Sequence, residues 1–161
     1  MIDANQAGNA NYNAAPQVQQ SFAVGKADQA TLTVVATPST VAYGSTSALS
    51  TTGGSGTGAV TYSAGLSTGC SAAGSTLSVI KASGTCNVTA TKAADTNYNL
   101  ATSAALPVTL TKADQTITFG ALSNKTLGDA DFTVSATASS GLPVDFSTST
   151  TSVCTITAGG T

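Results

Sequence analysis

The sequence contains no Arg, no Glu, no His and no Trp among its 161 residues. Its charged side chains are five Lys and seven Asp, which gives a formal net charge of −2 at pH 7. Such a chain offers no basic face to nucleic acid or to anionic lipid. Without Arg it lacks the usual side chain for holding phosphate and carboxylate groups, and without His it lacks the most versatile general base. We therefore predict that the protein is not an enzyme, uses no cofactor and does not bind nucleic acid.

Long apolar runs are missing as well. No stretch approaches the roughly 20 apolar residues that a membrane-spanning helix needs, so we expect no membrane insertion. No charged segment followed by an apolar one marks a signal peptide at the N-terminus. Because Met1 is followed directly by Ile2 and Asp3, we expect the chain to be a piece of a larger protein whose export signal lies elsewhere.

What the sequence does contain is typical of β-structure. Hydrophobic residues make up 41% of the chain. Disordered chains usually have a lower hydrophobic content, because they have too little apolar surface to bury. Val, Ile, Leu, Phe and Tyr recur in alternating runs among many Thr and Ser residues, and Thr and Val both favour pleated, half-buried surfaces. No segment keeps a helical period over ten residues. The sequence therefore predicts an all-β chain with a polar, Thr/Ser-rich surface.

A long internal repeat organises the chain. The tripeptide Asn-Tyr-Asn occurs at 11–13 and again at 97–99, and the tetrapeptide Lys-Ala-Asp-Gln occurs at 26–29 and again at 112–115. Both pairs are 86 positions apart, with no gap between them. Such a match at a fixed period is the signature of tandem structural units.

Beyond the second tetrapeptide the offset falls to 84 residues. In this frame several residues of special type match, namely Gly44 with Gly128, Tyr62 with Phe146, Ser63 with Ser147 and Cys70 with Cys154. We therefore divide the chain into the back of one unit (1–26), a complete unit (27–112) and the front of a third unit (113–161). We expect both outer pieces to be unfinished, so the chain is out of phase with its units.

The complete unit has about seven strand signals with turn residues between them. Alternation places Leu32 with Val34, and Leu77 with Val79, on single faces. The expected strands cover 30–36, 38–47, 47–52, 59–64, 75–82, 86–93 and 104–112, with 69–74 as a short edge piece or a turn and 94–99 as a loop. Short strands at this spacing predict a sandwich of two sheets. Its core would be aliphatic, with Tyr62 and Tyr98 as its aromatic members.

At this point the residues resemble a known group. The Lys-Ala-Asp-Gln junction, the Asn-Tyr-Asn loop and the Cys pair in a Thr/Val-rich unit are similar to the bacterial immunoglobulin-like (Ig-like) repeats of large exported surface proteins. The resemblance implies an Ig-like β-sandwich repeated in a tandem array, as in adhesins. It also implies that there is no catalytic motif to carry over.

The three cysteines fit the same frame. Cys70 and Cys86 lie in the complete unit, and we predict a disulfide between them, worth about 3 kcal/mol for a loop of this size. Free thiols remain an alternative, whereas a zinc site is disfavoured because there is no His and no Cys-x-x-Cys pair. Cys154 has no partner in this chain, unless a neighbouring chain supplies one. A disulfide indicates an oxidising compartment, and we expect an extracellular or cell-surface location.

Three further sites can be named, and each also has a structural interpretation that we favour. The two carboxylates of Gly128–Asp131 could hold Ca²⁺, but they are more typical of a solvated turn. Lys26 and Lys112 could form an isopeptide crosslink, which requires a buried lysine, but junction lysines are usually solvated. Tyr12 and Tyr98 could stack on a sugar ring, but an aromatic in such a loop more often fills the end of a sandwich.

Three functions follow from this interpretation. The first is an extracellular stalk or spacer that holds another module away from a cell surface. The second is a subunit of a head-to-tail filament, in which residues 2–26 of one copy complete the C-terminal piece of another. In that arrangement the strand that carries the second Cys would still be missing. The third is a glycan-binding module that uses Tyr98.

Overall fold

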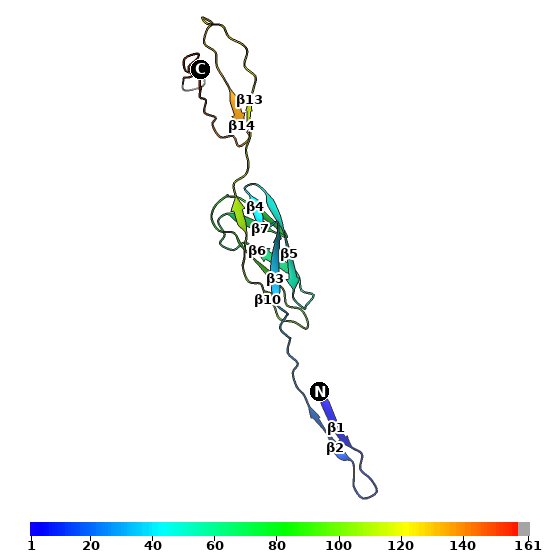
Figure 1. Cartoon of the computed structure of the whole chain (residues 1–161). Coiled ribbons are helices and arrows are strands. Elements are labelled where there is room, and N and C mark those ends of the chain that lie inside the picture. Colours follow the sequence, from blue (N-terminus) through cyan, green and yellow to red (C-terminus); the bar gives the residue numbers. More distant parts are fainter. Residues whose placement is uncertain (158–161) are drawn as a thin grey trace. The chain divides into compact units, whose positions relative to one another are not determined.

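The computed structural model describes residues 1–157. The described part is all-β and contains no helix (Figure 1). The chain divides into two compact regions, Met1–Thr111 and Lys112–Thr161. The first region includes residues 1–26, which the sequence assigns to a preceding unit, so that assignment remains a prediction.

The chain begins with a two-stranded antiparallel hairpin, coloured blue in Figure 1. Strand β1 (Ile2–Gln6) pairs with β2 (Ala15–Gln20), and Ile2 lies opposite Gln20 while Gln6 lies opposite Ala15. Every residue of both strands is exposed. The hairpin therefore leaves its apolar side chains in water, and an isolated two-stranded hairpin of this kind is only marginally stable.

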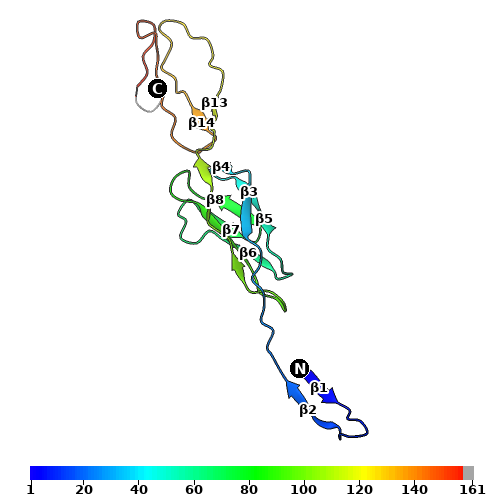
Figure 2. The same cartoon turned by 60° about the horizontal axis from the view of Figure 1, so that its bottom comes forward.

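The first sheet of the complete unit has four antiparallel strands in the order β3-β5-β8-β7. The strands are labelled in Figure 2. Alternate side chains along these strands are buried, as the sequence predicts for Leu32, Val34, Leu77 and Val79. The strands are β3 (Leu32–Thr37), β5 (Thr46–Gly53), β8 (Thr76–Val79) and β7 (Cys70–Ala73).

The second sheet is organised around one strand, β9 (Asn87–Lys92). On one side β9 pairs with β6 (Val60–Ser63), and on the other it pairs first with β10 (Ala101–Thr102) and then with β11 (Leu106–Pro107). All three pairings are antiparallel. The side chains of β9 alternate, so Val88 and Ala90 are fully buried.

The last strand of the unit changes partner. After β11, the backbone N–H of Val108 donates to the carbonyl oxygen of Cys86 at 2.8 Å. The chain then continues as β12 (Thr109–Thr111), which pairs in parallel with β4 (Thr40–Ala42). A parallel pair therefore joins the last strand of the unit to its second strand.

One hydrophobic core lies between the two sheets. Its side chains come from both sheets and include both half-cystines of the unit, and Tyr62 packs against it from the side. The buried members are Leu32, Val34, Ala36, Val41, Leu49, Cys70, Leu77, Val79, Cys86, Val88, Ala90 and Val108. Two sheets around a single apolar core make a β-sandwich, the architecture predicted from the sequence.

The number of strands in the unit differs from the prediction. The sequence divides it into about seven strands, whereas the structure has ten, β3 to β12. The expected strand over 104–112 is two strands, because the chain changes its partner at Val108. The edge piece expected at 69–74 is β7, a strand paired along its whole length with β8.

The C-terminal region contains one further antiparallel pair, β13 (Ile117–Phe119) and β14 (Ala136–Ala138). The rings of Phe119 and Phe146 make a tilted contact with their centroids 5.7 Å apart. Residues 144–147 match β6 in the repeat but form no strand here. Among the described residues of this region, β13 with β14 is therefore the only strand pairing.

Candidate functional site

The disulfide connects the two sheets of the complete unit. Cys70 is the first residue of β7, and Cys86 directly precedes β9. Both are buried, their Cα atoms are 5.5 Å apart, and 16 positions separate them in the sequence. The structure therefore joins the pair that the sequence predicts, and it adds that the bond crosses from one sheet to the other.

The Asn-Tyr-Asn loop is organised by the carboxylate of Asp95. Its Oδ1 atom accepts hydrogen bonds from the backbone N–H groups of Asn97 at 2.9 Å and Tyr98 at 2.8 Å. Its Oδ2 atom accepts from the backbone N–H and the hydroxyl of Thr57, at 2.6 and 3.2 Å. These bonds, that from the Thr57 backbone above all, lower the pKa of Asp95 to about 2. Asp95 therefore stays ionised above that pH and binds the loop to the turn that precedes β6.

The Lys-Ala-Asp-Gln segment lies against this loop. The N–H of Ala27 donates to the carbonyl oxygen of Asn97 at 2.9 Å, and the N–H of Asn99 donates to that of Ala27 at 2.9 Å. The side-chain amide of Asn99 donates to the Asp28 carboxylate at 2.8 Å. We call this set of contacts between residues 27–29 and residues 93–99 the clasp.

Gln29 completes the clasp from its half-buried position. Its side-chain amide donates to the carbonyl oxygens of Asn99 at 2.8 Å and Ala93 at 3.3 Å. Its Oε1 atom accepts from the N–H of Gly56 at 3.4 Å. The Gln29 side chain therefore contacts both the segment 93–99 and the loop before β6 that contains Gly56.

The clasp changes the interpretation of the repeated motif. The sequence presents 97–99 and 112–115 as one stretch, the last strand of a unit and the junction to the next. In the structure, the tetrapeptide at 26–29 contacts the loop at 97–99, and the Asp28–Asn99 bond spans 71 positions. The tetrapeptide at 26–29 and the loop at 97–99 thus contact each other within one folded unit, in which the loop precedes β10, β11 and β12. Sequence reasoning missed this contact, although the recurrence of both motifs was its signal.

The loop of the N-terminal hairpin has the same internal hydrogen bonds. Asn9, which lies 86 positions before Asp95, accepts at Oδ1 from the N–H groups of Asn11 at 2.8 Å and Tyr12 at 3.0 Å. The N–H of Asn9 donates to the Tyr12 carbonyl oxygen at 2.9 Å, as that of Asp95 does to the Tyr98 carbonyl oxygen at 3.0 Å. The hairpin loop is therefore a second example of loop 95–99, without a clasp contact among the described residues.

The strands around the two loops are also in the same register. Val88 lies opposite Leu106 and Lys92 opposite Ala101. Ile2 opposite Gln20 and Gln6 opposite Ala15 are the same pairs 86 positions earlier. The side chains differ in burial, however: Ile2 is 63% exposed and its counterpart Val88 is 0% exposed, while Phe22 is 66% exposed and its counterpart Val108 is 6% exposed.

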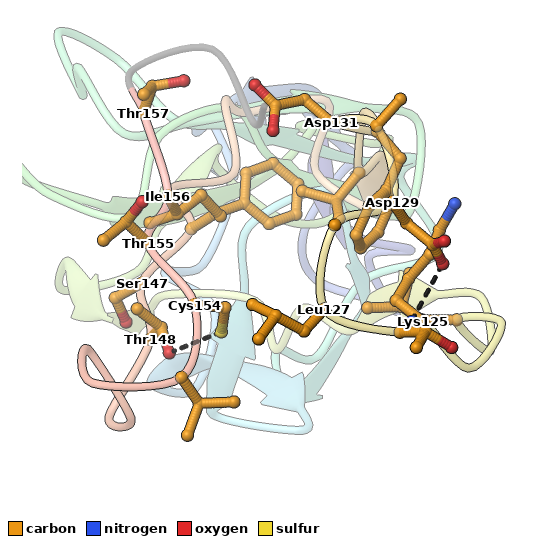
Figure 3. Close-up of a pocket in the computed structure, with 18 of the residues that line it drawn as sticks. Lys125, Leu127, Asp129, Asp131, Ser147, Thr148, Cys154, Thr155, Ile156 and Thr157 are labelled. Atoms are coloured by element: carbon orange, nitrogen blue, oxygen red, sulfur yellow. Dashed lines mark hydrogen bonds between the residues drawn. The ribbon is translucent and has the colours of Figure 1, made fainter.

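The C-terminal region contains a cavity of about 520 Å³. Figure 3 shows Lys125 and Asp129 on one side of it and Cys154, Thr155 and Ile156 on the other. The lining is mixed, with an apolar part made of Phe119, Leu122, Leu127, Phe132, Val134, Phe146, Val153 and Ile156 and a polar part made of Lys125, Asp129, Asp131 and several Ser and Thr residues.

Cys154 lies at this cavity as an exposed free thiol. Its sulfur lies 3.5 Å from the Thr148 hydroxyl and 3.9 Å from that of Thr150. Cys154 matches Cys70 in the repeat, and within residues 1–157 no second thiol is available to pair with it.

The other candidate sites have the ordinary structural interpretation. Lys26 and Lys112 are both exposed, so neither meets the burial requirement for an isopeptide crosslink. The Asp129 carboxylate accepts from the N–H of Thr126 at 2.9 Å and closes a turn, and residues 1–157 contain no group of three potential metal ligands. Tyr12 is exposed, whereas Tyr98 is half-buried in the loop of the clasp.

No family model matches this chain, and neither the curated proteins nor the solved structures contain a match to it. Across the described residues, no helix is long and apolar enough to cross a membrane.

Proposed function

We propose that this chain is a segment of an extracellular stalk, built from tandem Ig-like sandwiches, that holds another module away from a bacterial surface. The observation that carries the proposal is the recurrence of one loop and one strand register 86 positions apart. A unit that is repeated without a catalytic constellation is typical of an array whose function is its length.

The topology of the complete unit supports the Ig-like identity. It has two antiparallel sheets around one core, and its last strand β12 pairs in parallel with β4 near its beginning. The first strand, β3, lies at the edge of its sheet, which favours short junctions between consecutive units of the proposed array.

The disulfide supports both the location and the mechanical role. Such bonds persist in oxidising surroundings outside the cytosol. In a stalk under tension, the Cys70–Cys86 bond prevents the segment between the two cysteines from being stretched when the unit unfolds. Since it also connects the two sheets, it opposes their separation.

The stalk proposal is tested by length. Concatemers with three, four and five copies of residues 27–112 are examined by small-angle X-ray scattering. A stalk predicts a maximum dimension that grows by an equal step for each added unit. A compact chain, whose size rises only as about the 0.38 power of its length, contradicts the proposal.

The mechanical role is tested by force spectroscopy on the same concatemers. Reduction of the disulfide releases a sequence separation of 16, and we expect each unfolding step to lengthen by roughly 50 Å. Steps of equal length with and without reductant would show that the bond carries no load. Binding of the unmodified chain to a glycan array, lost on Y98A, would favour a glycan-binding module instead.

A further inference from the structure

We infer that the C-terminal region binds the β1–β2 hairpin of a second copy of this chain, with β1 paired antiparallel to residues 144–147. In the same contact, residues 113–115 lie against loop 9–13 of the second copy and form a clasp between chains. This inference goes beyond the stalk, since it concerns self-association and needs only the equivalence of the repeated segments.

The C-terminal region offers the receiving side. In the complete unit, β6 is held by β9, with Val60 opposite Lys92 and Tyr62 opposite Ala90. The matching residues 144–147 have no strand partner in the structure. Phe146, which matches Tyr62, instead lines the open cavity. The segment that matches β6 therefore contributes a side chain to the wall of this cavity.

The hairpin offers the inserting side. Strand β1 matches β9, so the expectation that this strand would be missing from the contact is wrong, and only the second half-cystine lacks a counterpart in β1. The register of β1 against β2 is that of β9 against β10 and β11. Ile2 of β1, and Phe22 just after β2, have the positions of buried core residues but are exposed. Covering them removes apolar surface from water, which is the main driving force for such an association.

The complete unit predicts the register of the contact between chains. Transferred from the β6–β9 pairing by the two offsets, Val144 lies opposite Gln6 and Phe146 lies opposite Ala4. By the same transfer, Asp145 lies opposite Asn5. Strand addition of this kind supplies main-chain hydrogen bonds for affinity, and the alternating side chains supply specificity.

The clasp gives the contact a second, polar part. The Asp28–Asn99 bond transfers to Asp114 of one copy and Asn13 of the other. Among residues 1–157, neither Asp114 nor Asn13 has a counterpart of that bond, although loop 9–13 already has the backbone shape of loop 95–99. Because the two surfaces of this contact differ, it is heterologous and extends into open chains.

The first experiment is sedimentation velocity of the full chain over a range of concentrations, with C154S as background to exclude intermolecular disulfides. We expect concentration-dependent association that a synthetic peptide of residues 1–26 inhibits. A charge-assisted hydrogen bond predicts that D114A weakens the association by about tenfold. The matched change D28A, in the closed clasp, should leave association unchanged. A monomer at every concentration overturns the inference.

The second experiment tests the register with engineered cysteines. In the C154S background, N5C combined with D145C should crosslink two chains under mild oxidation, because these positions lie opposite each other. T61C with T91C, an opposite pair within β6 and β9, is the positive control for geometry. D3C with D145C is shifted by two positions and should crosslink poorly.

The crosslinking pattern either supports the inference or overturns it. Crosslinked dimers and longer chains in the predicted register support the inference. Equal crosslinking in both registers, or an N5C–D145C bond formed within a monomer, overturns it. Failure here leaves the stalk untouched, since concatemers of residues 27–112 contain neither surface.

Discussion

The complete unit and the N-terminal hairpin contain matching sequence but bury it very differently. Val88 and Val108 lie in the core of the unit, and their counterparts Ile2 and Phe22 are exposed. The local structure is nevertheless the same in both places, with the same loop hydrogen bonds and the same strand register. Local sequence therefore determines the loop and the pairing, whereas burial depends on a partner sheet.

The same comparison applies to the other end of the chain. Residues 60–63 form β6 because β9 lies beside them, and their counterparts 144–147 form no strand. A strand in a sandwich is thus a property of a pair of segments.

The largest effect is expected from the disulfide. Replacing both half-cystines in C70S/C86S should lower the free energy of unfolding by about 3 kcal/mol, because the unfolded chain is no longer constrained. Urea unfolding followed by circular dichroism measures this loss. C154S is the matched control, since Cys154 is exposed and unpaired, and it should change stability by less than about 0.5 kcal/mol. Equal effects of the two changes would contradict the account.

A somewhat smaller effect is expected from a core truncation. V88A removes apolar groups from a fully buried site, and it should cost about 2 kcal/mol from lost burial and an unfilled cavity. I2A changes the matching residue of the hairpin and should leave the unfolding of the complete unit unchanged. The measurement is urea unfolding of both variants at a concentration where the chain is monomeric. Similar losses of unfolding free energy in the two variants would show that Ile2 is as well buried as Val88.

The clasp should contribute less. Q29A removes hydrogen bonds to Asn99, Ala93 and Gly56, and should lower the free energy of unfolding by about 1 kcal/mol. The counterpart of Gln29 is Gln115, whose side chain contacts the Ser140 hydroxyl and no loop of this kind among the described residues. Q115A should therefore leave the complete unit as stable as before, and a loss comparable to that of Q29A would refute the assignment of the clasp.

The smallest change concerns acid stability. The folded pKa of Asp95 is about 2, below the value near 3.9 of an unfolded Asp, so its contribution is complete above about pH 4. It is lost as the pH falls from about 4 to 2. D95N should remove this pH dependence while retaining the turn, because Asn9 forms the same turn in the hairpin. Carboxyl carbon shifts measured against pH give the pKa directly, and a value near 3.9 in the folded chain would contradict the prediction.

Much of the fold could be predicted from the sequence. Alternation located the buried residues of β3, β8 and β9, and the repeat paired Cys70 with Cys86 in one unit. The partner change at Val108 could not be predicted, because alternation continues through it and only the neighbouring strands reveal it. The clasp was missed for a similar reason, since the residues that form it are 71 positions apart.

Amide hydrogen exchange on the monomeric chain compares matching residues of the complete unit and of the two outer pieces in one sample. We expect strong protection for the amides of Ala27, Ala90 and Asn99, each of which donates a hydrogen bond within the complete unit. We expect fast exchange for their counterparts Ala113, Ala4 and Asn13. Equal protection of the two sets at low concentration would show that the outer pieces 1–26 and 113–161 are as well protected as the complete unit, although they lack its second sheet.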